Sequence, residues 1–432
     1  MKTILYPEKE SWDTLCKRPG IDKTDLEDVV REIINGVKSE MDNAIYCFSE
    51  KFDGVPPGSL KVSLTEIRKS IGQVPEELKM AINVAKTNIE NFHSAQLVTE
   101  PVIETFKGVK CWRKSVAIEK VGLYIPGGSA PLFSTVLMLG LPAKLAGCKE
   151  IIICTPPGKD GKVSPLILYT AQLVGITDIF KIGGAQAIAA MAYGTESVPK
   201  VYKIFGPGNQ YVTKAKELVQ QDGISIDMPA GPSEVLIIAD VTASPEFIAA
   251  DLLSQAEHGV DSQVIMLTDN KELIEKVKAE VGKQLQLLPR KAIALKALEN
   301  SKLILFPSLN DCIDFSNLYA PEHLIINTSD TNALANKVIN AGSVFLGNFS
   351  CESAGDYATG TNHTLPTNGF ARNYSGISTE SFLKKISFQE VSGDGIKNLG
   401  PTIELMAEAE FLSGHKNAVS VRLKSLQNDK YE

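Results

Sequence analysis

The chain has 432 residues, of which 44 are lysine or arginine and 51 are aspartate or glutamate, so its formal charge at pH 7 is −7. This length predicts at least two domains and a large apolar core. The basic residues are mixed with acidic ones and form no basic stripe, which argues against a nucleic-acid partner. The most apolar run, residues 132–141, is too short to span a bilayer, and the N-terminus lacks the apolar core of a signal peptide.

The seven cysteines are scattered without C-x-x-C spacing. Disulfides and a zinc knuckle are therefore not expected, and a cytoplasmic location fits. Cys148 ends a predicted helix and Cys154 lies in an apolar strand. Both are better explained by core packing than by nucleophilic catalysis.

The N-terminal quarter of the chain is predicted to be helical after a short arm. Residues 1–20 show little periodicity, whereas apolar residues recur at three- and four-residue spacing from Thr24 to about Ala95. The three helical stretches are 24–37, 39–52 and 75–92. His93 lies at the end of the last of them, within the helix, and is interpreted as a structural or surface residue.

From Val121 onward, short apolar strands alternate with helices, which indicates parallel sheets covered on both faces. The pattern runs once before residues 227–234 and once after them, and this favours two related α/β domains with a cleft between them. The tail from about Ser375 is expected to be helical. The predicted strands are 121–125, 150–154, 179–182, 202–205, 235–239, 263–268, 302–306, 324–327 and 343–347.

Three glycine-rich turns follow strands of the first α/β half, at 124–131, 182–189 and 205–212. Each would deliver the chain to a helix N-terminus, where backbone N–H groups attract phosphate. None has the G-x-G-x-x-G spacing of the standard dinucleotide fingerprint. Any one of them could be a simple turn, but three at the strand ends of one sheet favour a nucleotide-binding cleft.

The segment DMPAGPSE at 227–234 joins the two halves, and its prolines and glycine make it stiff. It could act as a rigid hinge, present Ser233 to the cleft, or do both.

A polar helix end at residues 251–259 could form half of a metal site. Ser244 is a suitable N-cap with Pro245 in the first helical position, and Gly259 suits the residue after the helix end. Gln255 and His258 are three residues apart, so both would share one helix face. The alternative is a helix end that simply faces solvent.

The chain has only five histidines, and four of them lie in its second half among polar residues. Such clustering predicts one site assembled from several loops. Glu322 and His323 are adjacent at the start of a strand, where they offer two bases of different pKa, although an ordinary loop pair remains open. Asp356 and His363 lie in a polar, glycine-containing loop of the kind that hosts ligands.

Nine stretches of the sequence together resemble the histidinol dehydrogenase family, from about residue 25 to residue 425. One local difference is the linker at 156–165, which is longer than in some relatives. The stretches are VGLYIPGGSAPLFSTVLM, IGGAQAIAA, KIFGPGN, DMPAGPSEVLIIAD, DLLSQAEHG, APEHLI, AGSVFLG, ESAGDYATGTNHTLP and GHKNAV.

The resemblance implies two incomplete Rossmann-like parallel-sheet domains with helical extensions at both ends. An N-terminal arm of residues 1–24 would precede a discontinuous substrate and zinc domain made of 25–120 and 234–374. Residues 121–233 would form the NAD-binding domain. Residues 375–432 would form a C-terminal helical extension that reaches the partner subunit of a homodimer.

The resemblance also implies the roles of individual residues. Glu322 and His323 would be the proton acceptors. One zinc ion per subunit would be bound by Gln255, His258, Asp356 and His415. Contacts to NAD would come from Tyr124, Gln186 and Asn209. The substrate, L-histidinol, would be held by Ser233, Gln255, His258, His323, Asp356, Glu410 and His415, with His363 lining the same pocket.

The implied reaction suits these residue types. It is the four-electron oxidation of L-histidinol to L-histidine through L-histidinaldehyde, with two NAD and one water, in histidine biosynthesis. Neutral His323 would take the hydroxyl proton near pH 7, and Glu322 would activate the water. Zinc with a single carboxylate ligand would keep a net positive charge and orient the substrate's imidazole and amine.

Three alternatives stand beside this interpretation. A zinc hydrolase would use the same metal, carboxylate and histidine but would not need the three glycine-rich turns. A dehydrogenase of the same superfamily could act on another alcohol, such as a sulfonated diol, although Glu410 and His415 suit a cationic amino-imidazole. The third alternative is a nucleotide-binding protein without catalytic activity.

Overall fold

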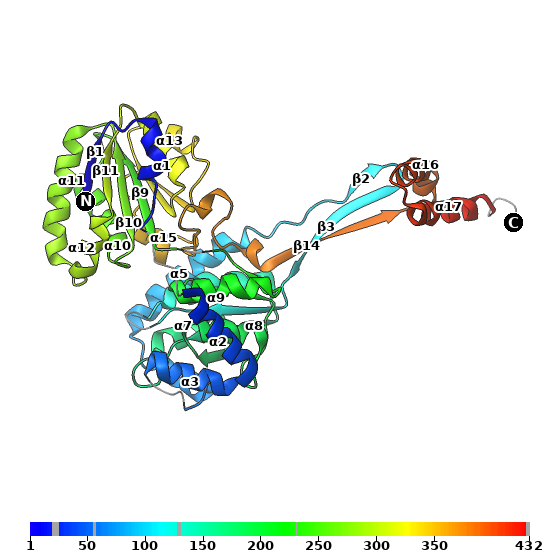
Figure 1. The fold of residues 1–432 in the computed structure, drawn as a ribbon, viewed down its shortest axis with the longest axis horizontal. Helices are drawn as coiled ribbons and strands as arrows, with labels where there is room; N and C mark the ends of the chain where they lie inside the picture. Colours follow the sequence, from blue (N-terminus) through cyan, green and yellow to red (C-terminus); the bar gives the residue numbers. More distant parts are fainter. Residues whose placement is uncertain (20–25, 55–57, 128–130, 230, 429–432) are drawn as a thin grey trace. The chain divides into compact units, whose positions relative to one another are not determined.

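The computed structural model describes residues 1–19, 26–54, 58–127, 131–229 and 231–428 (Figure 1). Thr24, part of the first glycine-rich turn and one residue of the 227–234 segment lie outside the described residues. The chain forms two compact units. The first unit consists of Met1–Gln96 with Ile118–Phe382, and the second of Leu97–Ala117 with Leu383–Glu432.

The first sheet of the larger unit is fully parallel, in the order β6-β5-β4-β7-β8. Four of its strands are the ones predicted from apolar runs. Its strands are β4 (Lys120–Tyr124), β5 (Glu150–Thr155), β6 (Asp178–Lys181), β7 (Lys203–Phe205) and β8 (Ser225–Ile226). The helices that connect them are α6 (Phe133–Ala146), α7 (Pro165–Val174), α8 (Gly184–Tyr193) and α9 (Gln210–Gln221).

The N-terminal helices pack on the helices of this first sheet. Their bounds are α2 (Leu26–Glu40), α3 (Asp42–Asp53), α4 (Leu64–Ile71) and α5 (Glu76–Ser94). Helix α2 contacts α8 and α9, α4 contacts α7, and α5 contacts α6. The sequence-based division assigned this segment to the substrate domain, whereas its contacts join it to the sheet expected to bind NAD. Helix α4 was not predicted, although Ser63 and Glu66 form the capping box that marks its start.

The second sheet is also fully parallel, in the order β1-β11-β10-β9-β12-β13. Its strands are β1 (Lys2–Leu5), β9 (Glu234–Ala239), β10 (Gln263–Thr268), β11 (Lys302–Leu305), β12 (His323–Asn327) and β13 (Ser343–Leu346). Its helices are α1 (Trp12–Leu15), α10 (Pro245–Ala256), α11 (Lys271–Gln284), α12 (Lys291–Glu299), α13 (Leu309–Tyr319), α14 (Thr331–Ala335) and α15 (Glu352–Tyr357). Figure 1 shows α10, α11 and α12 on one face and α1 with α13 on the other, so the strands are buried on both sides. The predicted α/β class with two parallel sheets is confirmed.

The N-terminal residues are more ordered than expected. They form β1, which pairs in parallel with β11 through Lys2 and Lys302 at its start. The short helix α1 that follows begins with Trp12, whose ring packs edge-on against Phe306 and Phe315. A four-residue strand has too few positions to show periodicity, which is why the sequence indicated only an arm.

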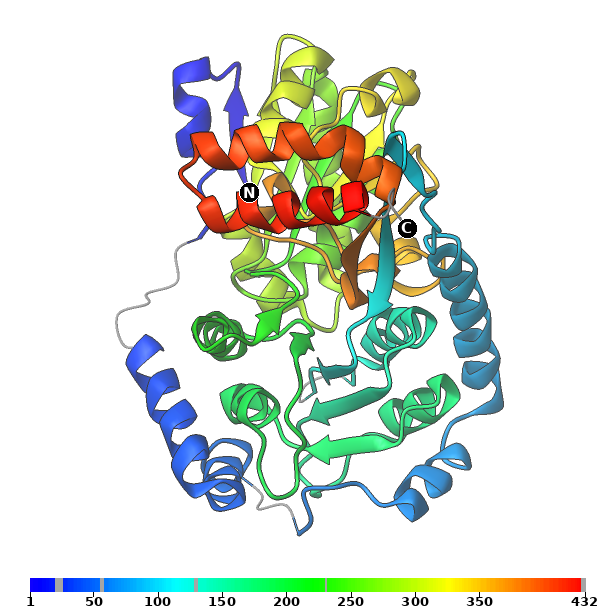
Figure 2. The ribbon, with the colours of Figure 1, turned by 90° about the vertical axis from the view of Figure 1, so that its right-hand side faces the viewer.

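The second unit is an antiparallel sheet in the order β14-β3-β2, followed by a helical hairpin. The strands are β2 (Ile103–Phe106), β3 (Val109–Ala117) and β14 (Leu383–Val391), and the helices are α16 (Gly393–Ala409) and α17 (Ser413–Asn428). Figure 2 shows α16 and α17 side by side. The expectation of a helical tail from Ser375 was wrong for β14, whose residues are almost all exposed and so lack an apolar pattern. Among the described residues, no helix is long and apolar enough to cross a membrane.

Candidate functional site

Several predicted site residues of the second half gather at the amino ends of β9 and β12. His323 is the first residue of β12, and it pairs in register with Val235 of the adjacent β9. Glu322 immediately precedes His323, and Glu234 is the first residue of β9. Neighbouring parallel strands therefore place the two proposed bases beside the end of the 227–234 segment.

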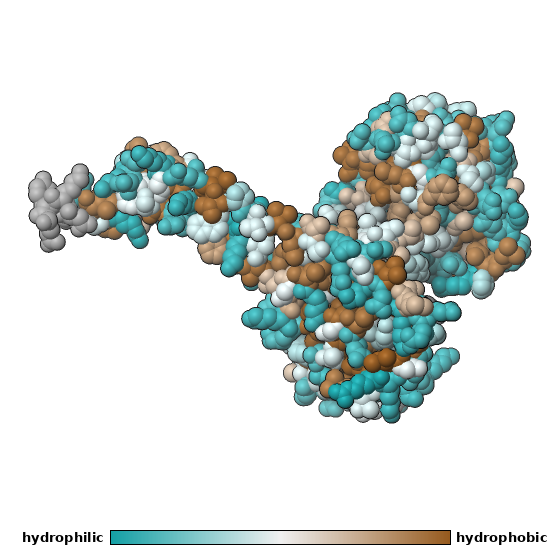
Figure 3. Space-filling model, turned by 180° about the vertical axis from the view of Figure 1, so that it is seen from behind, coloured by the Kyte–Doolittle hydropathy of each residue, from teal (hydrophilic) through white to brown (hydrophobic). Residues whose placement is uncertain are grey.

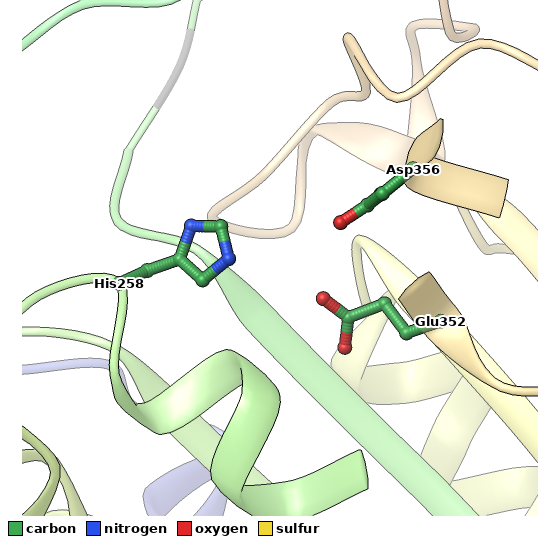
Figure 4. Close-up of side chains that lie close together, drawn as sticks. All are labelled: His258, Glu352 and Asp356. Atoms are coloured by element: carbon green, nitrogen blue, oxygen red, sulfur yellow. The ribbon is translucent and has the colours of Figure 1, made fainter. Parts of the chain in front are cut away.

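A group of potential metal ligands lies at this edge. The ligand atoms of His258, Glu352 and Asp356 all lie within 4.8 Å of one another, and the three side chains point toward a common centre (Figure 4). Glu352 and Asp356 are four residues apart on α15, so they share one helix face. Glu352 is buried and was missed by sequence analysis, because its spacing to Asp356 is informative only if the segment is known to be helical.

Gln255 lies against the buried Glu352. With its amide nitrogen toward Glu352 it donates to both carboxylate oxygens, and its oxygen accepts from the Glu234 N–H at 3.0 Å. With the amide oxygen toward Glu352, two acceptors would face each other, and a proton or a cation would have to lie between them. Gln255 is thus joined to the cluster by Glu352 in either orientation.

The helix that carries Gln255 begins as predicted and ends earlier than predicted. Ser244 caps it by accepting from the Phe247 N–H, with Pro245 in the first position. The helix stops at Ala256, so His258 lies in the turn beyond it rather than on the same helix face as Gln255. Its N–H bonds to the Gln255 carbonyl, which closes the end with a tight turn. No left-handed residue is needed, and Gly259 does not have a positive φ.

The main chain of Glu234 holds both proposed bases. Its N–H donates to Glu322 Oε2 at 2.8 Å, and its carbonyl bonds to His323 Nδ1 at 3.1 Å. A carbonyl can only accept, so Nδ1 carries a proton and His323 presents Nε2 to the cluster. Nε2 is buried, has no hydrogen-bond partner among the described residues, and lies 3.6 Å from Asp356 Oδ1.

Carboxylates dominate the electrostatics of this site. Burial raises the pKa of Glu322 to about 8. Burial lowers the pKa of His323, but Glu322, Glu352 and Asp356 outweigh it and raise this pKa to about 10. These carboxylates favour the protonated ring, so the prediction that His323 is neutral near pH 7 requires additional positive charge beside them. An additional cation among them would lower the pKa of His323 and restore its lone pair.

The predicted NAD contacts lie on β4 of the first sheet and on two of its helices. The Tyr124 hydroxyl accepts from the Gly184 N–H at 3.1 Å, at the start of α8. Gln186, on the same helix, is buried, and its side-chain nitrogen has no hydrogen-bond partner in the part of the chain that the structure describes. Asn209 caps α9, since its Oδ1 accepts from the N–H groups of Tyr211 and Val212.

The remaining predicted residues are distributed over both units. His363 Nδ1 bonds to the Asp356 carbonyl at 2.9 Å, and its Nε2 lies 3.3 Å from the Thr135 hydroxyl, so His363 links the cluster to α6. Ser233 is half-buried next to Glu234. Glu410 and His415 belong to the second compact unit, where both are exposed.

Comparison with known proteins identifies the family. The family model described as histidinol dehydrogenase matches residues 16–423. The chain belongs to the histidinol dehydrogenase family of enzymes. It is 59% identical to the histidinol dehydrogenase of Bacteroides thetaiotaomicron over 427 residues, covering 99% of this chain and all of the relative. A relative from Aliivibrio fischeri is 51% identical, with 99% of this chain and 97% of the relative covered.

The fold agrees with this assignment to the histidinol dehydrogenases. The crystal structure of histidinol dehydrogenase from Elizabethkingia anophelis matches with a TM-score of 0.97 at 57% identity, covering 99% of both chains. The resemblance stated from sequence is therefore confirmed, and the family assignment favours a dehydrogenase over a zinc hydrolase.

The chemistry of the cluster fits a zinc ion in this family member. Imidazole nitrogen, carboxylate oxygen and amide oxygen are all suitable donors for zinc. A cation would also stabilise the ionised forms of the buried carboxylates in this cluster. His323 Nε2, which has no hydrogen-bond partner among the described residues, lies beside Asp356 of the same cluster. The donors present are thus compatible with the predicted metal.

Asp251, on α10, adds a further buried carboxyl whose pKa burial raises to about 7. Between pH 3.8, the usual pKa of an aspartate, and about pH 7, this carboxyl group is protonated in the folded chain and ionised in the unfolded chain. The free energy of unfolding therefore falls as pH rises between about 4 and 7, and the full cost is present above pH 7.

We expect Asp251→Asn to stabilise the enzyme at pH 8 by on the order of 2 kcal/mol and to have little effect at pH 4. Thermal unfolding of both proteins at the two pH values, without added metal, measures the difference. An equal change at both pH values would show that ionisation of Asp251 does not destabilise the fold.

Proposed function

We propose that this chain catalyses the zinc-dependent, four-electron oxidation of L-histidinol to L-histidine through L-histidinaldehyde, with two NAD and one water, in histidine biosynthesis. The observation that carries the proposal is the buried Glu322–His323 pair, held by one backbone residue beside a cluster of metal-ligating side chains. Family membership supports the substrate and the pathway.

Gln255, His258 and Asp356 would hold the zinc, together with His415 of the partner subunit. When bound, zinc supplies positive charge that orients the substrate's imidazole and amine and offsets the buried carboxylates. Glu352 lies within the same group of ligand atoms and contacts Gln255. We therefore add Glu352 to the residues proposed to shape the metal site.

His323 is proposed to accept the hydroxyl proton in the first oxidation. Its Nδ1 is fixed on the Glu234 carbonyl, so Nε2 is the atom available to the substrate. Nε2 can accept a proton only when the ring is neutral, which requires the surrounding carboxylates to be balanced by other positive charge.

Glu322 is proposed to take a proton from the water that adds to the aldehyde, before the second oxidation. A carboxylate with a pKa of about 8 is a stronger base than an exposed glutamate and is matched to neutral or slightly alkaline pH. Its Oε2 is held by the Glu234 N–H, which leaves Oε1 to receive the proton.

Other residues would position the two ligands. We propose that Ser233, His363, Glu410 and His415 contact histidinol along with the zinc ligands and His323. Tyr124, Gln186 and Asn209 would contact NAD, which accepts hydride when bound. The buried Gln186 amide nitrogen without a partner supports this placement, since a bound ligand could supply the missing acceptor.

We also propose that the enzyme is a homodimer with shared active sites. The second unit exposes large apolar side chains, which Figure 3 shows in brown along this unit. Apolar patches on so small a unit favour burial against another protein surface. The exposed residues include Val102, Ile103, Phe106, Leu405, Met406 and Phe411.

Mixing two inactive variants tests whether the site is shared. If each site takes His415 of the partner subunit, a heterodimer of Glu322→Gln and His415→Asn chains has one site with both defects and one intact site. Random exchange makes half of the dimers mixed, so about a quarter of wild-type activity should return. If His415 serves its own chain, every site keeps one defect and no activity returns despite verified exchange.

Metal removal tests the proposed function as a whole. Reduction of NAD in the presence of histidinol should stop after dialysis against a chelator and return on addition of zinc. Full activity in protein shown to be free of metal would contradict the zinc-dependent reaction.

A further inference from the structure

We infer that Arg18, from the N-terminal segment, is a positioning residue that sets the geometry of the two proposed bases. This inference rests on the proposed function. Arg18 contacts neither base directly. It contacts Glu234, whose main chain holds both bases, and the turn that precedes Glu322.

The first contact is a buried ion pair with the Glu234 side chain. Arg18 Nε donates to Oε1 at 2.8 Å, and Nη2 donates to Oε2 at 2.9 Å. The Asn368 N–H also donates to Oε1, at 2.7 Å. Glu234 is almost fully buried, so the arginine supplies the positive charge that this carboxylate requires. The main chain of the same residue holds Glu322 and His323.

The second contact is with the turn that leads into Glu322. Arg18 Nη2 donates to the Tyr319 carbonyl at 2.8 Å and lies 3.4 Å from the Ala320 carbonyl. The guanidinium also lies over the Tyr319 ring, 3.8 Å from its centroid. Ala320 has a φ of +54°, which a residue with a side chain rarely adopts, so this turn needs such support.

The guanidinium group of Arg18 therefore holds both the first residue of β9 and the turn that precedes β12. Proton transfer depends on placing the acceptor atom within a fraction of an ångström, and a displacement of about 1 Å can lower the rate about 100-fold. The expected signature is a fall in kcat with little change in KM for histidinol. Arg18 makes its hydrogen bonds with Glu234, Tyr319 and Ala320 rather than with a proposed zinc ligand, so the zinc content should also be retained.

The test compares wild type with Arg18→Ala, Arg18→Lys and a matched control, Arg372→Lys. Arg372 is exposed and donates to the carbonyl of Leu318, one residue before Tyr319, so it supports the same turn without touching Glu234. We expect kcat to fall about 100-fold for Arg18→Ala and about 10-fold for Arg18→Lys. The ammonium group of lysine lacks the planar set of donors with which the guanidinium group binds the Glu234 carboxylate and the Tyr319 carbonyl together. Arg372→Lys should retain wild-type kcat.

Chemical rescue separates positioning from general loss of structure. A cavity of about 260 Å³ is lined by Arg18 along with Lys2, Lys17 and Lys302, and it gives small solutes access to this position. Guanidinium chloride at a concentration too low to unfold the protein should restore at least part of the kcat of Arg18→Ala, whereas ammonium chloride should not. If Arg18→Ala does not fold, Arg18→Lys still gives the kcat and KM comparison.

The outcomes are distinguishable. If wild type and Arg372→Lys oxidise histidinol but both Arg18 variants keep wild-type kcat, the inference about Arg18 is overturned. Loss of activity in Arg18→Ala that follows the loss of folded protein, together with wild-type kcat in a folded Arg18→Lys variant, also overturns it. If wild type itself forms no NADH from histidinol, the proposed function fails instead.

Discussion

Replacing His258 with alanine is expected to abolish zinc binding and to lower turnover by at least about 100-fold, while the fold survives. Substituting a residue that merely supports a metal ligand already lowers metal affinity or activity by about 10- to 100-fold, so removal of a ligand should cost at least as much. His258 lies in an exposed turn beyond the end of α10, and its imidazole points into the cluster with Glu352 and Asp356. Its truncation leaves no cavity in the core.

Metal analysis of the purified His258→Ala variant and of wild-type enzyme, with circular dichroism to verify folding, checks this prediction. Glu257→Gln is the matched control, because Glu257 lies in the same turn and is not part of the metal-ligand group. A full complement of zinc in the His258→Ala variant would remove His258 from the set of ligands.

Glu322→Gln is expected to stop the reaction after the first hydride. The amide can still accept from the Glu234 N–H, so the strand should keep its geometry, but it cannot take a proton from water. His323 remains available for the alcohol step. A general base contributes about 100- to 10,000-fold to the rate of its step, and the second hydride should slow by a factor in this range.

Single-turnover kinetics with rapid quenching measures the two hydride transfers separately. One NADH should form at nearly the wild-type rate and the second much more slowly, with histidinaldehyde accumulating. The ionisation of Glu322, whose pKa burial raises, should no longer contribute to the pH profile of the second hydride transfer in this variant. His323→Asn is the matched comparison and should slow the first hydride. Equal slowing of both steps in Glu322→Gln would assign this residue another role.

Apolar runs in the sequence were sufficient to predict most strands of the two buried parallel sheets, but not β1 or β8. Strands such as β9 and β10 are apolar at almost every position because both faces are covered, and they appear in the sequence as continuous apolar runs. Strands β3 and β14 were missed because their sheet is largely exposed and their side chains alternate without a clear apolar face. Their pairing joins residues separated by more than 260 positions, which local patterns cannot reveal.

The sequence predicted only the part of the candidate site that lies in short local motifs. Glu322, His323 and Asp356 lie in short motifs that suggest chemistry, and the structure brings them together. Glu352 carries no signal of its own, since its role depends on the helical spacing to Asp356 and on burial beside Gln255. Arg18 lies 216 positions from its partner Glu234, and only the folded chain shows that the two residues form an ion pair.

The most direct test of the account is the stoichiometry of the complete reaction. A limiting amount of histidinol is incubated with zinc-loaded enzyme and excess NAD, and both NADH and the organic product are quantified at completion. The account predicts two NADH and one histidine for each histidinol consumed. One NADH with histidinaldehyde as the final product, or no NADH at all, would contradict it.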